Sequence, residues 1–118
     1  MNPTIEWCDI KSRRCLVLHF DRYLSEEDAQ NAVSQLTSMI GPSSDKVVMV
    51  KECTRMTDYD SGAREAWQKF IKNIKSRLEA IHLVSNNFLI RIGATAIGVF
   101  AGIKIHAWAD MEQFHTGF

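Results

Sequence analysis

Residues 46–78 decide the fold: KVVMVKEC (46–53), TRMTDYDSG (54–62) and AREAWQKFIKNIKSRL (63–78). The first part places apolar, β-branched residues in succession, which is typical of a strand covered on both faces. The last part repeats its apolar residues at steps of three and four through Leu78, which indicates an amphipathic helix. We therefore predict a buried strand, a polar turn and a helix. Ligands of open parallel sheets bind at the carboxyl ends of the strands, where this turn lies.

Length and composition limit the classes of protein to which this chain can belong. A chain of 118 residues suffices for one domain with a core and is too short for two, so residues 1–118 are assigned to one domain. Fourteen basic and fourteen acidic residues cancel without a block of like charge, which disfavours a nucleic-acid-binding protein. Because Cys8, Cys15 and Cys53 show no paired spacing and no signal-peptide pattern is present, we expect a reduced, cytoplasmic setting.

The longest apolar run covers residues 88–103, and Arg91 is its one charged residue. It is shorter than the roughly 20 residues that span a bilayer, so we predict no transmembrane segment. Gly93 and Gly98 would allow the backbone of a helix to approach the sheet closely, and we expect a helix buried against the sheet. The run holds more apolar residues than one helix face can bury, which indicates a homodimer interface or a lid over an apolar ligand.

The other segments complete an alternation of strands and helices. Ser25 precedes three acidic residues, which is typical of a helix N-cap, and Gly41 with Pro42 ends that helix. Right-handed crossovers make strands two to five largely parallel and leave the first strand antiparallel, at an edge. We therefore predict an α/β fold of order β-β-α-β-α-β-α-β, a mixed, mostly parallel five-stranded sheet with helices packed on it. The expected strands are 4–10, 15–20, 46–53, 80–85 and 103–108, the expected helices are 26–40, 63–78 and 88–101, and Asp110 is expected to cap a terminal turn.

The turn before the second helix carries the sharpest local signal for function. Asp60 or Ser61 caps the helix in the simplest interpretation, because a side-chain oxygen there accepts a hydrogen bond from an early amide. In the functional interpretation, Ser61 is phosphorylated, and the phosphate meets free amides and the positive end of the helix dipole. It also meets Asp58 and Asp60, so a partner surface would sense the added charge.

The order of elements, with the motif DSG (60–62) at the start of the second helix, resembles the STAS domains, the anti-sigma-factor antagonists of sporulation and stress pathways. In that family, a Ser or Thr in an Asp-Ser-Ser-Gly or Asp-Ser-x-Gly motif at this helix start is phosphorylated by a partner kinase. The motifs AREAW (63–67), IRIGA (90–94) and GVFAG (98–102) resemble a bacterial branch of small stand-alone proteins grouped with STAS and Sec14-like domains.

The resemblance implies a non-enzymatic regulatory module whose partner is an anti-sigma or kinase-like protein. With the Gly in register, Ser61 takes the phosphorylated position, and a Tyr replaces the family's preceding Asp. We expect the partner to contact the turn, the neighbouring strand ends and the second helix. The residues expected in this surface are Asp21, Asp58, Tyr59, Asp60, Gly62, Arg64 and Asn86.

Several polar residues end or follow strands on the side of the sheet where Ser61 lies. They form either a polar pocket around that serine or a set of loops that are polar because they meet water. These residues are Asp21, Tyr23, Glu52, Thr54, Ser85 and Asn86.

Other reactive side chains favour neither a metal site nor an enzyme. His19, His82 and His106 fall in three strands without the spacing of a ligand motif, so we predict no metal and no cofactor. Cys53 is a small buried hydrophobe or a reactive thiol. We predict no catalytic residues. The alternative function is a carrier or sensor of an apolar small molecule or lipid between the third helix and the sheet, as the likeness to Sec14-type folds implies.

Overall fold

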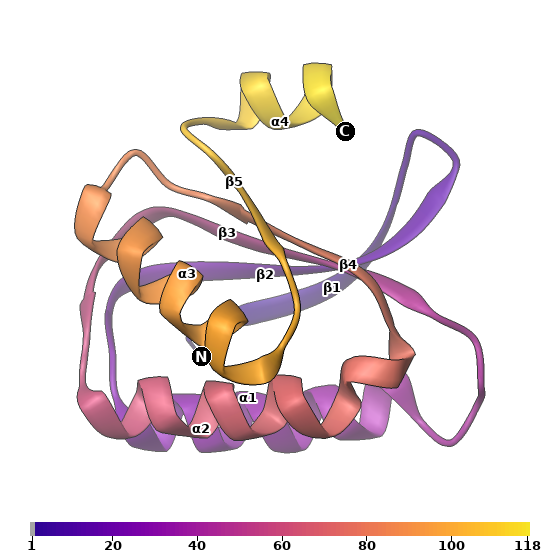
Figure 1. Cartoon of the computed structure of the whole chain (residues 1–118), viewed down its shortest axis with the longest axis horizontal. Coiled ribbons are helices and arrows are strands. Elements are labelled where there is room, and N and C mark those ends of the chain that lie inside the picture. The colour runs from indigo at the N-terminus through magenta and orange to yellow at the C-terminus, as the bar shows by residue number, and fades with distance from the viewer. Residues whose placement is uncertain (1) are drawn as a thin grey trace.

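The computed structural model describes residues 2–118. Within them, strands and helices alternate after an initial hairpin, as Figure 1 shows. The strands are β1 (Thr4–Ile10), β2 (Arg13–Leu24), β3 (Val47–Tyr59), β4 (Leu78–Val84) and β5 (Ile105–Trp108). The helices are α1 (Glu26–Ile40), α2 (Ser61–Ile74), α3 (Phe88–Ala101) and α4 (Met111–Gly117), and a 3-10 turn, η1 (Lys75–Arg77), follows α2.

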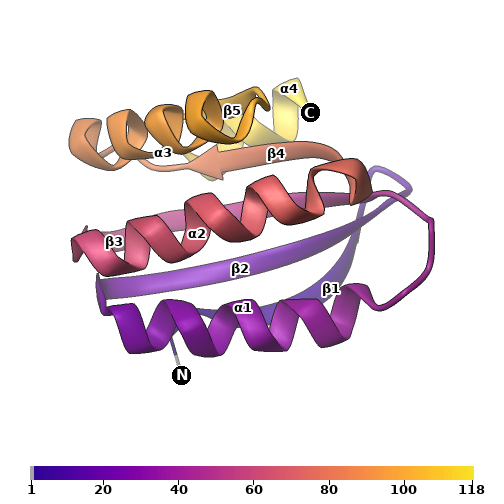
Figure 2. The same cartoon turned by 60° about the horizontal axis from the view of Figure 1, so that its bottom comes forward.

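The five strands lie in the order β1-β2-β3-β4-β5. β1 is antiparallel to β2, and the pairs from β2 to β5 are parallel, which confirms the predicted α/β fold and its mixed, mostly parallel sheet. The three crossovers step across the sheet in one direction. Because such crossovers are right-handed, α1, α2 and α3 all lie on one face, where they form a row in Figure 2.

β2 and β3 are longer than predicted, and the prediction of a polar turn over 54–62 is wrong. β3 continues to Tyr59, so that Asp60 alone separates it from α2. The ends of the two strands pair from Asp21 opposite Arg55 to Leu24 opposite Tyr59. The exposed positions of these strand ends carry polar side chains because this part of the sheet meets water. A polar composition is also typical of turns, which explains the wrong prediction.

Side-chain caps set the start of each crossover helix. Ser25 accepts a hydrogen bond from the backbone of Asp28 at 3.1 Å, and the Asp28 carboxylate accepts one in return, which closes a capping box on α1. Asp60 caps α2 and Asn87 caps α3. Asp110 caps α4, as predicted, although this last element is a helix of two turns.

The predicted extension of α2 to Leu78 is wrong, because α2 ends at Ile74 and Leu78 begins β4. The intervening turn places Arg77 against the end of α1. Its guanidinium donates to the carbonyls of Gly41 and Asp45 at 2.8 Å, and to the carbonyl before Gly41 at 3.2 Å. Arg77 therefore supplies donors to carbonyls that the end of α1 leaves without a helical partner.

The core has two layers, one on each face of the sheet. Alternate residues of β2, β3 and β4 point to the two faces, so these strands are covered on both sides, as predicted for 46–53. The larger layer lies under α1, α2 and α3 and includes Leu16, Leu18, Met49, Trp67, Phe70, Ile81 and Leu83. The smaller layer lies under α4 and consists of Cys15, Val17, Val48, Val50, Val84 and Phe114.

The bounds of α3 agree with the prediction, but the helix is buried on one side only. Ile90, Ala94 and Ile97 face the core. The opposite side exposes large apolar side chains, in agreement with the expectation that one helix face cannot bury them all. This exposed apolar face of α3 consists of Phe88, Leu89, Ile92, Val99 and Phe100. Within residues 2–118, no helix has both the length and the hydropathy needed to cross a membrane.

Candidate functional site

The junction of β3 and α2 places Asp60 and Ser61 in different roles. One carboxylate oxygen of Asp60 accepts a hydrogen bond from the backbone of Ala63 at 2.8 Å, and the other accepts one from the backbone of Glu26 at 3.0 Å. A single side chain thus caps α2 and joins it to the start of α1. Ser61 is the first residue of α2 and is exposed. Asp60 alone accounts for the cap, so capping leaves the identity of Ser61 unexplained.

Acidic and aromatic side chains surround this junction. Tyr23 lies opposite Asp58 in the β2–β3 pair. Desolvation and the nearby carboxylates of Asp60 and Asp58 raise the pKa of the Tyr23 phenol. Gly62 lies against the side chain of Glu26, which a Cβ at this position would displace. A phosphate on Ser61 would therefore enter an acidic surface at the amino end of α2.

The remaining polar strand ends form separate groups. Asp21 pairs with Arg55 at 3.5 Å, and Asn2 bridges to the backbone of Asp21. Ser85 is buried and accepts a hydrogen bond from the backbone of Asn87, where it closes the link between β4 and α3. Asn86 is exposed in the same link.

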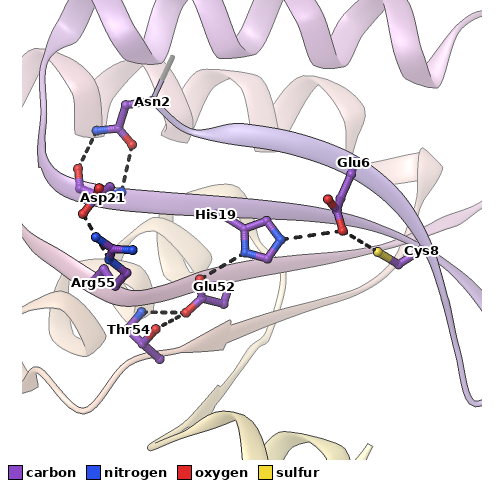
Figure 3. Close-up of polar contacts among 8 residues, drawn as sticks. All are labelled: Asn2, Glu6, Cys8, His19, Asp21, Glu52, Thr54 and Arg55. Carbon is purple, nitrogen blue, oxygen red and sulfur yellow. Dashed lines mark hydrogen bonds and ion pairs between the residues drawn. The ribbon is translucent and has the colours of Figure 1, made fainter.

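Glu52 and Thr54 belong to a network on the face of the sheet opposite α1, α2 and α3 (Figure 3). The Glu52 carboxylate accepts hydrogen bonds from the backbone and the hydroxyl of Thr54, and it lies 3.2 Å from His19 Nδ1. The other nitrogen of His19 lies 3.8 Å from Glu6. Glu6 also accepts a hydrogen bond from Cys8, whose pKa it raises to about 11. The network joins β1, β2 and β3, and its thiol is a poor nucleophile.

His19, His82 and His106 do not come together at one place. His82 and His106 stack at 5.1 Å on neighbouring strands, whereas His19 lies on β2. Trp108 donates a hydrogen bond to His82 Nδ1 at 3.0 Å, and burial lowers the pKa of His82 to about 4. Residues 2–118 contain no group of three side chains suited to hold a metal ion.

A cavity of about 40 Å³ lies at the carboxyl end of the sheet, between β3, α2 and α3. Its walls are mainly apolar, and no acidic side chain lines it. The lining residues are Phe20 and Leu24 from β2, Lys51, Cys53, Met56 and Tyr59 from β3, Arg64 and Trp67 from α2, Leu83 from β4, and Ile90, Gly93, Ala94 and Ile97 from α3.

Lys51 is the unusual residue of this cavity, because it is 5% exposed on the helix-covered face of β3. Its ammonium lies 4.4 Å from the ring centroid of Trp67 and 5.7 Å from that of Phe20. Burial lowers the pKa of Lys51 to about 8. Burial also raises the pKa of Cys53 to about 12, which favours the interpretation of Cys53 as a small buried hydrophobe.

Two further N–H groups of the cavity residues have no acceptor. Trp67 Nε1 and Arg64 Nε are buried and lack a hydrogen-bond partner within residues 2–118. Buried polar groups are normally paired, so these two groups lack an acceptor that the described residues could supply. The sequence carried one sign of this site, which is Lys51 inside the apolar run of the central strand.

Comparisons with known proteins identify the fold. No protein-family model matches the chain, and no curated protein matches it. Among solved structures, the chain is similar to an uncharacterized protein from Shewanella loihica PV-4, of the DUF3478 family, with a SpoIIAA-like fold. The TM-score is 0.76 at 13% sequence identity, over 96% of this chain and 91% of that chain. The present chain therefore has a SpoIIAA-like fold, the fold of STAS domains.

Proposed function

We propose that the protein is a non-enzymatic regulatory module of the bacterial cytoplasm, and that it binds an anti-sigma or kinase-like protein through the β3–α2 junction and α2. The observation that carries the proposal is the division of roles at this junction. Asp60 makes the structural hydrogen bonds, whereas Ser61 is exposed beside it. The partner surface comprises Ser61 with Asp21, Asp58, Tyr59, Asp60, Gly62, Arg64 and Asn86.

Phosphorylation of Ser61 is the switch in this proposal. A phosphate adds about two negative charges beside Asp58 and Asp60. Because Ser61 is exposed, the added charge changes the surface that a partner meets and leaves the core as it is. A partner that binds the unmodified acidic surface through cations gains affinity, and one that presents carboxylates loses it.

Mass spectrometry of protein isolated from its own cells tests the switch. Intact mass and peptide mapping, over several growth states, should find one phosphate, located on Ser61. Ser61→Ala should remove it, whereas Ser44→Ala, at another exposed serine, should keep it. Absence of phosphate from Ser61 in every growth state would contradict the switch.

A second candidate function is a carrier or sensor of a small, largely apolar molecule, and the cavity under α3 supports it. Native mass spectrometry after mild extraction should then show a bound species. Ala94→Leu fills the cavity from α3 and should abolish binding, whereas Ala96→Leu on the same helix, outside the cavity lining, should retain it. A protein that carries no molecule and binds none from a panel of small apolar compounds would contradict this function.

The exposed apolar face of α3 supports a further element of the proposal, a homodimer. Five large apolar side chains lie on that face. Exposed apolar side chains that lie together often mark an interaction surface. Two copies that place these faces together would remove them from water.

A further inference from the structure

The walls of the cavity are mainly apolar, and three of its lining residues carry nitrogen donors. They are Lys51 from β3, and Trp67 and Arg64 from α2, whose Nε1 and Nε atoms are buried without a hydrogen-bond partner within residues 2–118. All three can only donate hydrogen bonds. Two of the side chains carry a positive charge, and no Asp or Glu is among the lining residues. These donors are therefore suited to a negatively charged acceptor.

The contacts of Lys51 within the protein leave its charge incompletely compensated. Its ammonium lies over the ring of Trp67. Such a cation–π contact replaces part of the favourable hydration energy that the charge loses on burial. Buried charges are otherwise paired with an opposite charge. Within residues 2–118, Lys51 has aromatic neighbours and no carboxylate partner. An anion in the cavity would supply that partner.

The size of the cavity selects among anions. About 40 Å³ corresponds to roughly three or four water-sized probes, which suits a carboxylate with a short carbon chain. Three donors match the two oxygens of a carboxylate, whereas a phosphate presents more oxygens than these donors can serve. Met56, Ala94 and Ile97 line the cavity too and offer apolar contact to the chain.

We propose that this cavity binds a small monocarboxylic acid, with Lys51 as the counter-ion of the carboxylate and with Trp67 and Arg64 as hydrogen-bond donors. The proposal rests on the second candidate function and specifies the chemical class of its ligand. The competing explanation is that Lys51 serves the fold alone, through its cation–π contact with Trp67.

Isothermal titration calorimetry with matched ligands separates these explanations. The probes are the sodium salts of acetic, propionic and butyric acids, each compared with the alcohol of the same chain length. We expect the carboxylates to bind and the alcohols to bind about 10- to 100-fold more weakly, because the alcohol lacks the charge that faces Lys51.

Lys51→Met tests the counter-ion directly, since Met keeps an unbranched apolar chain in the same place. It should weaken carboxylate binding to the level of the alcohol and leave alcohol binding unchanged. Lys69→Met, at an exposed lysine of α2, should bind as the parent does. A thermal unfolding curve of each variant verifies that it is folded.

Three outcomes would overturn the proposal, and they differ in what else they affect. Equal binding of acid and alcohol would overturn the carboxylate specificity and leave the small-molecule function standing. Carboxylate binding that survives Lys51→Met would overturn the role of Lys51. Binding of neither series would overturn the carboxylate site and count against the small-molecule function too.

Discussion

Burial disfavours the charged form of Lys51, and the resulting loss of stability can be measured. A fall in the pKa of Lys51 from 10.5 to about 8 lowers the unfolding free energy by about 3 kcal/mol near neutral pH. Replacement of Lys51 by an apolar residue would remove this cost, but it would also remove the cation–π contact with Trp67, which contributes about 1 kcal/mol of stability. We predict that Lys51→Met raises the unfolding free energy by about 2 kcal/mol at neutral pH, measured by urea denaturation without ligand.

The same residue predicts a pH dependence. Above the folded-state pKa of about 8, Lys51 is neutral in the folded protein, whereas the unfolded chain still binds the proton up to about 10.5. The parent protein therefore gains stability relative to Lys51→Met as pH rises, by about 1 kcal/mol between about pH 7 and pH 9. The nearby groups Cys53, Tyr59 and Arg64 are present in both proteins, so the comparison largely removes their own titration. A difference that stays constant with pH would show that Lys51 keeps its ordinary pKa.

At the scale of the elements, Asp60 couples two helices. Asp60→Ala removes the hydrogen bonds to the backbones of Ala63 and Glu26, and we expect it to cost about 1–2 kcal/mol of unfolding free energy. Asp60→Asn keeps an acceptor for the cap and should cost less. Asp58→Ala, at an exposed residue, is the matched control. Equal stability of all these variants in urea denaturation would show that the cap contributes nothing.

The sequence predicted correctly those elements that are set by residues close together in the chain. The helix 88–101 and the caps at Ser25 and Asp110 follow from apolar spacing and capping chemistry, which act within a few residues. The end of β3 did not follow, because residues 54–59 are strand only through pairing with the end of β2. Pairing partners are distant in the sequence, and no pattern within the segment reveals them.

The cavity could not be predicted for a related reason. Alternation along β3 places Lys51 on the face of Met49 and Glu52 on the face of Val50. The assignment of these faces to helices or solvent depends on the direction of the crossovers. Their position at the predicted end of the strand grouped Glu52 and Thr54 with Ser61, whereas the structure places them in a network on the face opposite the three crossover helices.

At the scale of the whole molecule, the apolar face of α3 predicts the oligomeric state. Sedimentation or light scattering should give the mass of a dimer for the parent protein. Val99→Glu places a charge at a side chain that is 79% exposed and should yield a monomer of unchanged fold. Ser34→Glu, at an exposed polar residue of α1, should remain dimeric. A monomeric parent at all accessible concentrations would contradict the dimer.

α2 carries both proposed sites, with Ser61 at its first residue and the cavity residues Arg64 and Trp67 one and two turns further along. A ligand that favours one position of α2 and a phosphate that favours another would act on a single mechanical element. Thermodynamic linkage makes such an influence mutual: if phosphorylation changes the affinity for ligand by some factor, ligand changes the phosphorylation equilibrium by the same factor. The protein would then report metabolite supply and kinase activity as one combined signal.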